Sequence, residues 1–218
     1  MKNRLTFVEW LLIAAISLTF LLTVLTGGCA RPQPQPVTPG KMVLPVANML
    51  PTMVRLKVVR VFPGFLNTRI TQKLVRARDI FASYGVGMEV VSVHEMDMPD
   101  WLAITESDQP SMDLFAKESK EHIVFLVESI TIKGEPAGGA GVSRWCAIAL
   151  ASWDHSISHE VLHAALRLAD IDQQDDRQGH RNTPLNLMAN QNVTEDHVRL
   201  EEDQVDALRG WAKLRWGG

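Results

Sequence analysis

Two histidines and a glutamate form the most chemically informative pattern in the chain, in the segment His159-Glu160-Val161-Leu162-His163. Residues i and i+4 share one face of an α-helix, so both imidazoles would point the same way and could hold one zinc ion. Glu160 is the next residue round the helix, where its carboxylate could act on a zinc-bound water. The pattern therefore predicts His159 and His163 as zinc ligands and Glu160 as the catalytic base.

A catalytic zinc site needs three protein ligands and an open position for water, and several residues could supply the third ligand. Asp170 is nearest in sequence, but a helix running through it would carry it about 10 Å along the axis from His163. His180 follows a polar segment that can fold the chain back, so we expect His180 as the third ligand. The alternatives, after Asp170, are Asp172, Glu195 and Glu201.

Hydrophobic patterning predicts an α+β domain with a twisted mixed sheet, an active-site helix and a C-terminal helix. Strands are predicted at 53–62, 88–93, 122–130 and 144–152, and helices at 68–84, through the His159 segment to Asp170, and at 200–213. In the first helix the charged residues, Lys73 among them, fall mostly away from the apolar face, and Gly85 is expected to end it. Residues 97–119 are expected to be mostly loop with one short helix, and 134–141 a turn-rich loop.

This order of elements resembles that of the zinc-dependent metzincin peptidases, especially small bacterial members of matrixin-like layout. The resemblance is carried by the HExxH pattern at 159–163, by Asn186-Leu187-Met188, which is similar to the family's Met-turn, and by the start of the last helix at 200–205. It implies a zincin-type fold, Met188 beneath the zinc, and hydrolysis of peptide bonds. Around the HExxH and at Gly179-His180 the chain also resembles SprT/Spartan-type proteases, whose third histidine follows a long gap.

The first 51 residues are predicted to lie outside the folded domain, which spans 52–218. Residues 1–29 have a basic start, an apolar run and the ending Gly27-Gly28-Cys29, so they are similar to a bacterial lipoprotein export signal with Cys29 lipidated. An uncleaved membrane anchor is the alternative. Alternating prolines in 30–51 predict an extended tether. Either way the domain would lie in the cell envelope, membrane-tethered and facing the periplasm or the exterior.

Composition narrows the possible partners. The net charge is −3 and no basic block is present, so no nucleic acid partner is expected.

Cys146 lies in an apolar stretch and is predicted to be a buried free thiol. His155, one turn before His159, is expected to line the cleft. Glycines at 138, 139 and 141 could shape a peptide-binding strand edge, although a plain hairpin turn is favoured.

The sequence therefore predicts a zinc-dependent peptidase that cleaves protein or peptide substrates through a zinc-bound water, with Glu160 as general base. The alternative is a non-catalytic zinc-binding envelope lipoprotein that acts as an interaction module. The presence of Glu160 favours the enzyme, because a structural zinc site is more often closed by a fourth protein ligand.

Overall fold

The computed structural model describes residues 52–61, 67–169, 180, 183, 185–189 and 198–217. The predicted export signal and tether lie outside these residues, as do Asp170, Asp172 and Glu195. The described ranges contain both strands and helices, and the predicted α+β fold with a mixed sheet is confirmed. None of the helices in those ranges has both the length and the apolarity needed to cross a bilayer.

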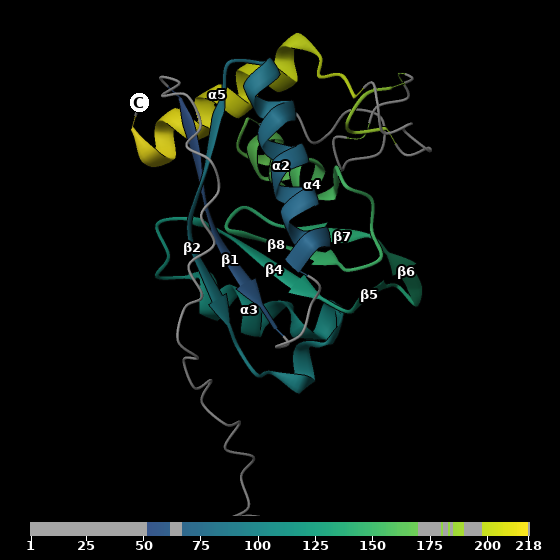
Figure 1. Ribbon diagram of the computed structural model, residues 1–218. Helices are drawn as coiled ribbons and strands as arrows, with labels where there is room; N and C mark the ends of the chain where they lie inside the picture. The colour runs from purple at the N-terminus through teal and green to yellow at the C-terminus, as the bar shows by residue number, and fades with distance from the viewer. Residues whose placement is uncertain are drawn as a thin grey trace, which may run out of the picture. The chain divides into compact units, whose positions relative to one another are not determined.

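The main sheet has five strands in the order β2-β1-β4-β8-β7 and is twisted (Figure 1). Four of its strands run parallel to one another: β1 (Met53–Arg60), β2 (Gly87–Glu95), β4 (His122–Val127) and β8 (Trp145–Ala149). The fifth, β7 (Gly139–Gly141), pairs antiparallel with β8 and forms one edge of the sheet. The expectation of a plain hairpin turn at these glycines is therefore wrong.

A smaller sheet has the order β3-β5-β6 and comprises β3 (Ala103–Thr105), β5 (Ser129–Ile132) and β6 (Glu135–Ala137). The prediction of one strand over 122–130 is wrong at its end, because the chain leaves the main sheet at Glu128. The N–H groups of Glu128 and Ser129 donate to the Leu102 carbonyl at 2.8 and 3.1 Å, which turns the chain into the second sheet. The exposed polar residues Glu128 and Ser129 interrupt the apolar run at this turn, a signal that the prediction of a single strand overlooked.

Other segments predicted as loop also contain regular structure. Besides β3, the stretch 97–119 holds α3 (Gln109–Ala116) and two short 3-10 helices, Pro99–Trp101 and Glu106–Asp108. The stretch 134–141 holds β6 and β7. These strands have only three residues each, which is too short for periodicity to reveal.

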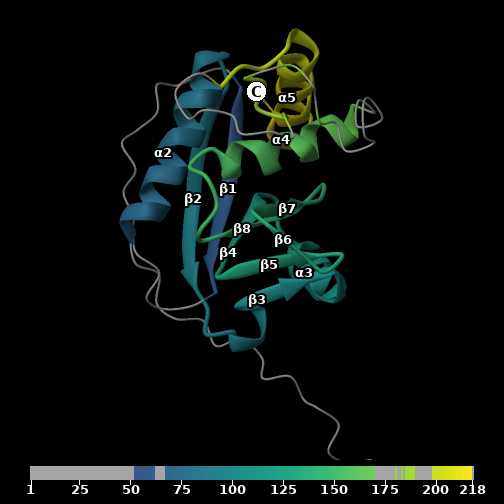
Figure 2. The same ribbon diagram turned by 90° about the vertical axis from the view of Figure 1, so that its right-hand side faces the viewer.

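The main sheet is buried on both faces. Along β4, Val124 and Leu126 belong to one core, whereas Ile123 and Phe125 belong to the other. Three helices pack in the first core: α2 (Asn67–Ser83), α4 (Ser156–Leu168) and α5 (Glu202–Trp216). In the second core α3 and the small sheet cover the opposite face (Figure 2). Because side chains of a strand alternate between its faces, cover on both faces requires the continuous apolar runs seen in the sequence.

Helix α2 ends as predicted before Gly85, whose positive φ of 73° suits glycine. The periodicity of α2 predicted that Lys73 lies away from the buried face, and this prediction is wrong because Lys73 is only 2% exposed. Its ammonium group donates to the Ser152 carbonyl, to the Ser152 hydroxyl at 3.2 Å and to the Trp153 carbonyl at 2.7 Å. Lys73 thus holds the loop that joins β8 to α4.

Helix α4 ends at Leu168, two residues short of the predicted run through Asp170. Residues from Ile157 to Leu166 are almost all buried, whereas the three residues after Leu166 are exposed. Since most helical stability in proteins comes from packing of an apolar face, the helix ends where that packing ends.

Candidate metal centre and cleft

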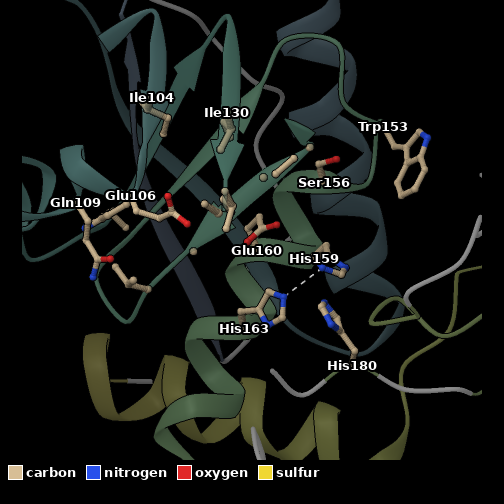
Figure 3. A pocket seen from close by; sticks show the side chains of 18 of the residues that line it. Ile104, Glu106, Gln109, Ile130, Trp153, Ser156, His159, Glu160, His163 and His180 are labelled. Carbon is tan, nitrogen blue, oxygen red and sulfur yellow. Dashed lines mark hydrogen bonds between the residues drawn. The ribbon is translucent and has the colours of Figure 1, made fainter. Parts of the chain in front are cut away.

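The three histidines predicted as ligands lie together beside α4 (Figure 3). His159 and His163 come from successive turns of α4, and His180 comes from the chain that follows it. One ring nitrogen from each lies within 4.8 Å of the other two. In the part of the chain that the structure describes, no cysteine or carboxylate belongs to this group. A bound ion would therefore keep a coordination position for water.

The spacing of the two donor atoms on α4 fits zinc. The Nε2 atoms of His159 and His163 are 3.2 Å apart. Nitrogens bound tetrahedrally at about 2.0–2.1 Å from zinc would be about 3.3 Å apart. The Nδ1–H of His159 donates to the Leu187 carbonyl at 2.7 Å, so Nε2 presents its lone pair toward the cluster.

The electrostatic environment of His159 favours the neutral imidazole that metals bind. Burial lowers its pKa to about 4; the Leu187 carbonyl opposes this shift, and His180 and His155 add to it. The ring is therefore neutral at pH 7 before any ion binds, and no proton has to be displaced from its Nε2.

The carbonyl that orients His159 is itself held by α5. The next residue toward the N-terminus, Asn186, is 1% exposed, and its side-chain amide forms two reciprocal hydrogen bonds with that of Gln204, at 2.9 and 3.1 Å. The Asn186 carboxamide oxygen also accepts the Met188 N–H at 2.8 Å. This network connects the first turn of α5 to the histidine cluster, and Met188 lies fully buried in the core beside it.

Glu201, one of the alternative ligands, caps helix α5 and lies outside the histidine cluster. Its side chain caps the N-terminus of α5 in a reciprocal capping box with Gln204, and it accepts hydrogen bonds from Thr183 at 2.8 Å and Asn186 at 3.3 Å. It does not belong to the histidine group. Its carboxylate contributes to the stability of the helix that supports the site.

Glu160 lies next to the histidine cluster but faces another way. Figure 3 shows its carboxylate between the imidazoles and Glu106. It is 6% exposed, and burial raises its pKa to about 8, which Arg167 partly offsets. A cation at the histidines would favour the ionised form.

A cleft of about 540 Å³ opens above these residues. Strand β7 and residues of the small sheet line it, together with the histidines and Glu160. As expected, His155 lines the cleft; it is 3% exposed and stacks on Trp153 at 5.4 Å between ring centroids. Cys146 is free and fully buried, as predicted, and burial raises its thiol pKa well above the usual range.

Several residues of the cleft were not singled out by sequence analysis. Trp153, Glu106 and Gln109 belong to no recognisable motif, and Trp153 lies far along the chain from the other two. Only the exposed tryptophan gives a weak signal, because a large aromatic side chain beside a catalytic pattern often contacts ligand.

No protein-family model matches this sequence, and no curated protein matches it. Among solved structures, metalloproteinase-II from Bacteroides fragilis is similar, with a TM-score of 0.55 and 12% identity, covering 78% of this chain and 55% of that one. Archaemetzincin from Methanopyrus kandleri is similar with a TM-score of 0.50 and 12% identity, covering 73% of this chain and 96% of that one. The chain thus spans about half the length of the Bacteroides protein. At such low identity the likeness shows the fold alone, which is metzincin-like.

Proposed function

We propose that this chain is a zinc-dependent peptidase whose zinc ligands are His159, His163 and His180 and whose general base is Glu160. The observation that carries the proposal is the convergence of three imidazoles beside a buried carboxylate in one cleft. The likeness of the fold to two metallopeptidases supports it. A purely structural zinc site would more often have four protein ligands and no cleft above them.

In this proposal the catalytic chemistry is divided among the zinc ion, its ligands and Glu160. Zinc supplies a Lewis acid that lowers the pKa of water to about 7 and polarises a carbonyl. The three histidines would hold the ion, and the Leu187 carbonyl orients the ring of His159. Glu160 accepts the proton of the attacking water and returns it to the leaving amine.

The substrate is proposed to be an extended peptide that lies along β7. Strand β7 is an edge strand and lines the cleft, so its outer backbone groups can pair with a peptide. Backbone pairing fixes the direction of the substrate, and the side-chain pockets of the cleft would set specificity.

We also propose that the domain works in the cell envelope, tethered through Cys29 or an uncleaved anchor. The support for this is the composition of the first 51 residues. A secreted environment is compatible with the buried thiol of Cys146, which has no second cysteine in the domain with which to pair.

The proposal is tested with zinc analysis and digestion of a peptide library by three proteins: wild type, Glu160→Gln, and the control Glu128→Gln, which changes an exposed glutamate in a turn. Glu160→Gln keeps shape and polarity but removes the base. It should therefore retain one zinc per chain and lose hydrolysis by about 10²–10⁴-fold, while the control matches wild type.

Three outcomes count against the proposal. Equal activity of wild type and Glu160→Gln excludes Glu160 as the base. If all three proteins hold zinc and none cleaves a peptide, the chain is better described as a non-catalytic zinc-binding module. Absence of stoichiometric zinc after metal-replete purification rejects the metal site itself.

A further inference from the structure

Strand β7 presents two glycines to helix α4. Gly139 and Gly141 are two residues apart, so they share one face of the strand. Ala140, between them, packs against the core on the opposite side of the sheet. The face turned toward Glu160 is therefore free of side chains over the length of β7.

The Glu160 side chain fills the space that side chains on this face would need. A Cβ atom at Gly139 would lie 2.6 Å from Glu160 Cγ and 2.7 Å from its Cδ. At Gly141 it would lie 3.0 Å from the Glu160 carbonyl oxygen and 3.0 Å from Oε2. A Cβ at the neighbouring Gly138 would meet only the Ser152 Cβ, at 3.4 Å, which is close to ordinary contact.

Backbone conformation does not explain the two glycines. The described glycines with positive φ are Gly85, Gly134 and Gly217, so β7 has backbone angles that alanine also adopts. What distinguishes Gly139 and Gly141 is the approach of the Glu160 carboxylate.

We propose that Gly139 and Gly141 are positioning residues that form a notch in β7 and hold the Glu160 carboxylate in place. A glutamate has three side-chain torsions, and the notch selects the arrangement in which the carboxylate lies against β7. A methyl group at Gly139 would push the carboxylate into the cleft or move β7 away from α4. A displacement of about 1 Å is enough to lower catalysis about 10²-fold.

The catalytic part of this inference rests on the proposed function and deepens it. Strand β7 would carry out two tasks: its outer edge pairs with the peptide, and its inner face receives the base. The scissile bond and the proton acceptor would then be placed by the same three residues.

The notch itself is tested without metal or substrate by a double-mutant cycle. The free energy of unfolding of the metal-free protein is measured by urea denaturation for wild type, Gly139→Ala, Glu160→Ala and the double variant. Gly139→Ala should change the equilibrium constant for unfolding in both backgrounds. The factor should be at least about three times larger in the wild-type background than in the Glu160→Ala background. Equal effects in both backgrounds would overturn the notch, since the two residues would then not interact.

Gly138→Ala is the matched control, because it adds the same methyl group one residue earlier without meeting Glu160. Its effect should be the same in both backgrounds. Should Gly139→Ala fail to fold, Gly141→Ala takes its place in the cycle, since its methyl group meets Glu160 at 3.0 Å.

The positioning role is then tested by kinetics of the zinc-loaded proteins. Gly139→Ala should retain zinc and lower kcat at least about tenfold with little change in KM, whereas Gly138→Ala should keep wild-type kcat. In the Gly139→Ala protein, Glu160→Asp should restore part of the lost kcat, because aspartate is one methylene shorter. Unchanged kcat for Gly139→Ala overturns the positioning role. If wild type hydrolyses nothing, the proposed function fails while the unfolding cycle still decides the notch.

Discussion

Two side chains of the site are positioned by groups from other parts of the chain. The ring of His159 is held by the Leu187 carbonyl, and the Glu160 carboxylate lies against the glycines of β7. The ring of His180 stacks on that of His159 at 5.4 Å and meets His163 edge-on at 4.9 Å. The local helix thus supplies two donors, and a distant segment supplies the third.

A prediction follows for the third ligand. His180→Ala should lower zinc affinity at least about 100-fold, because a two-ligand site holds zinc weakly, whereas Asp170→Ala should change it less than about tenfold. Competition with a chromophoric chelator measures both. His94→Ala is the control, since His94 lies on β2 outside the histidine cluster. Its side chain forms a hydrogen bond with Ser92. Loss of metal in Asp170→Ala with retention in His180→Ala would show that the ligand assignment is wrong.

Among the secondary-structure elements, α5 and β4 meet in a buried contact that bears on stability. His122 of β4 is fully buried, and its ring meets that of Trp211 edge-on at 5.5 Å. Burial first, and then the Arg215 guanidinium, lowers the pKa of His122 to about 3, which a backbone interaction at Ser143 only partly offsets. The imidazole is therefore neutral in the folded protein.

The consequence is an acid-sensitive fold. The folded pKa lies below the ordinary value of 6.5, so only the unfolded chain binds the proton between pH 6.5 and about 3. The contribution of His122 to stability is complete above pH 6.5 and is lost progressively as the pH falls through that window. His122→Phe should abolish this loss. Between pH 6 and 4 the metal-free wild type should lose about 1 kcal/mol more per pH unit than the variant.

Urea unfolding of both proteins at several pH values measures the difference. Other groups that titrate in this range, His159 among them, are present in both proteins and cancel in the comparison. Parallel stability curves would mean that His122 is protonated in the folded state.

For the whole molecule, the proposed location in the cell envelope depends on the N-terminal segment. We predict that Cys29 is lipidated and that residues 1–28 are removed, because an apolar run ends at Gly27-Gly28-Cys29. Mass spectrometry of the protein from the membrane fraction should show a lipid-modified Cys29 as the first residue. An intact N-terminus with unmodified Cys29 would support the uncleaved anchor instead.

Cys146 should resist alkylation until the domain is unfolded, because it is fully buried.

The sequence by itself determined what depends on neighbours along the chain. The spacing of His159 and His163 on an apolar helix, and the strands and helices long enough to show periodicity, follow from local geometry. His180 was selected among several candidates because a polar segment precedes it, and the structure brings it to the other two histidines.

Only the tertiary structure decided the features that arise between distant segments. Only the fold shows that the residues after Glu128 join a second sheet, and the burial of Lys73 depends on carbonyls of a loop nearly 80 residues later. The notch at Gly139 exists only because β7 lies against α4, so two glycines that read as a turn in the sequence make room for a carboxylate. A sequence pattern indicates which face of a helix or strand is apolar. Which other element packs on that face depends on the fold of the whole chain.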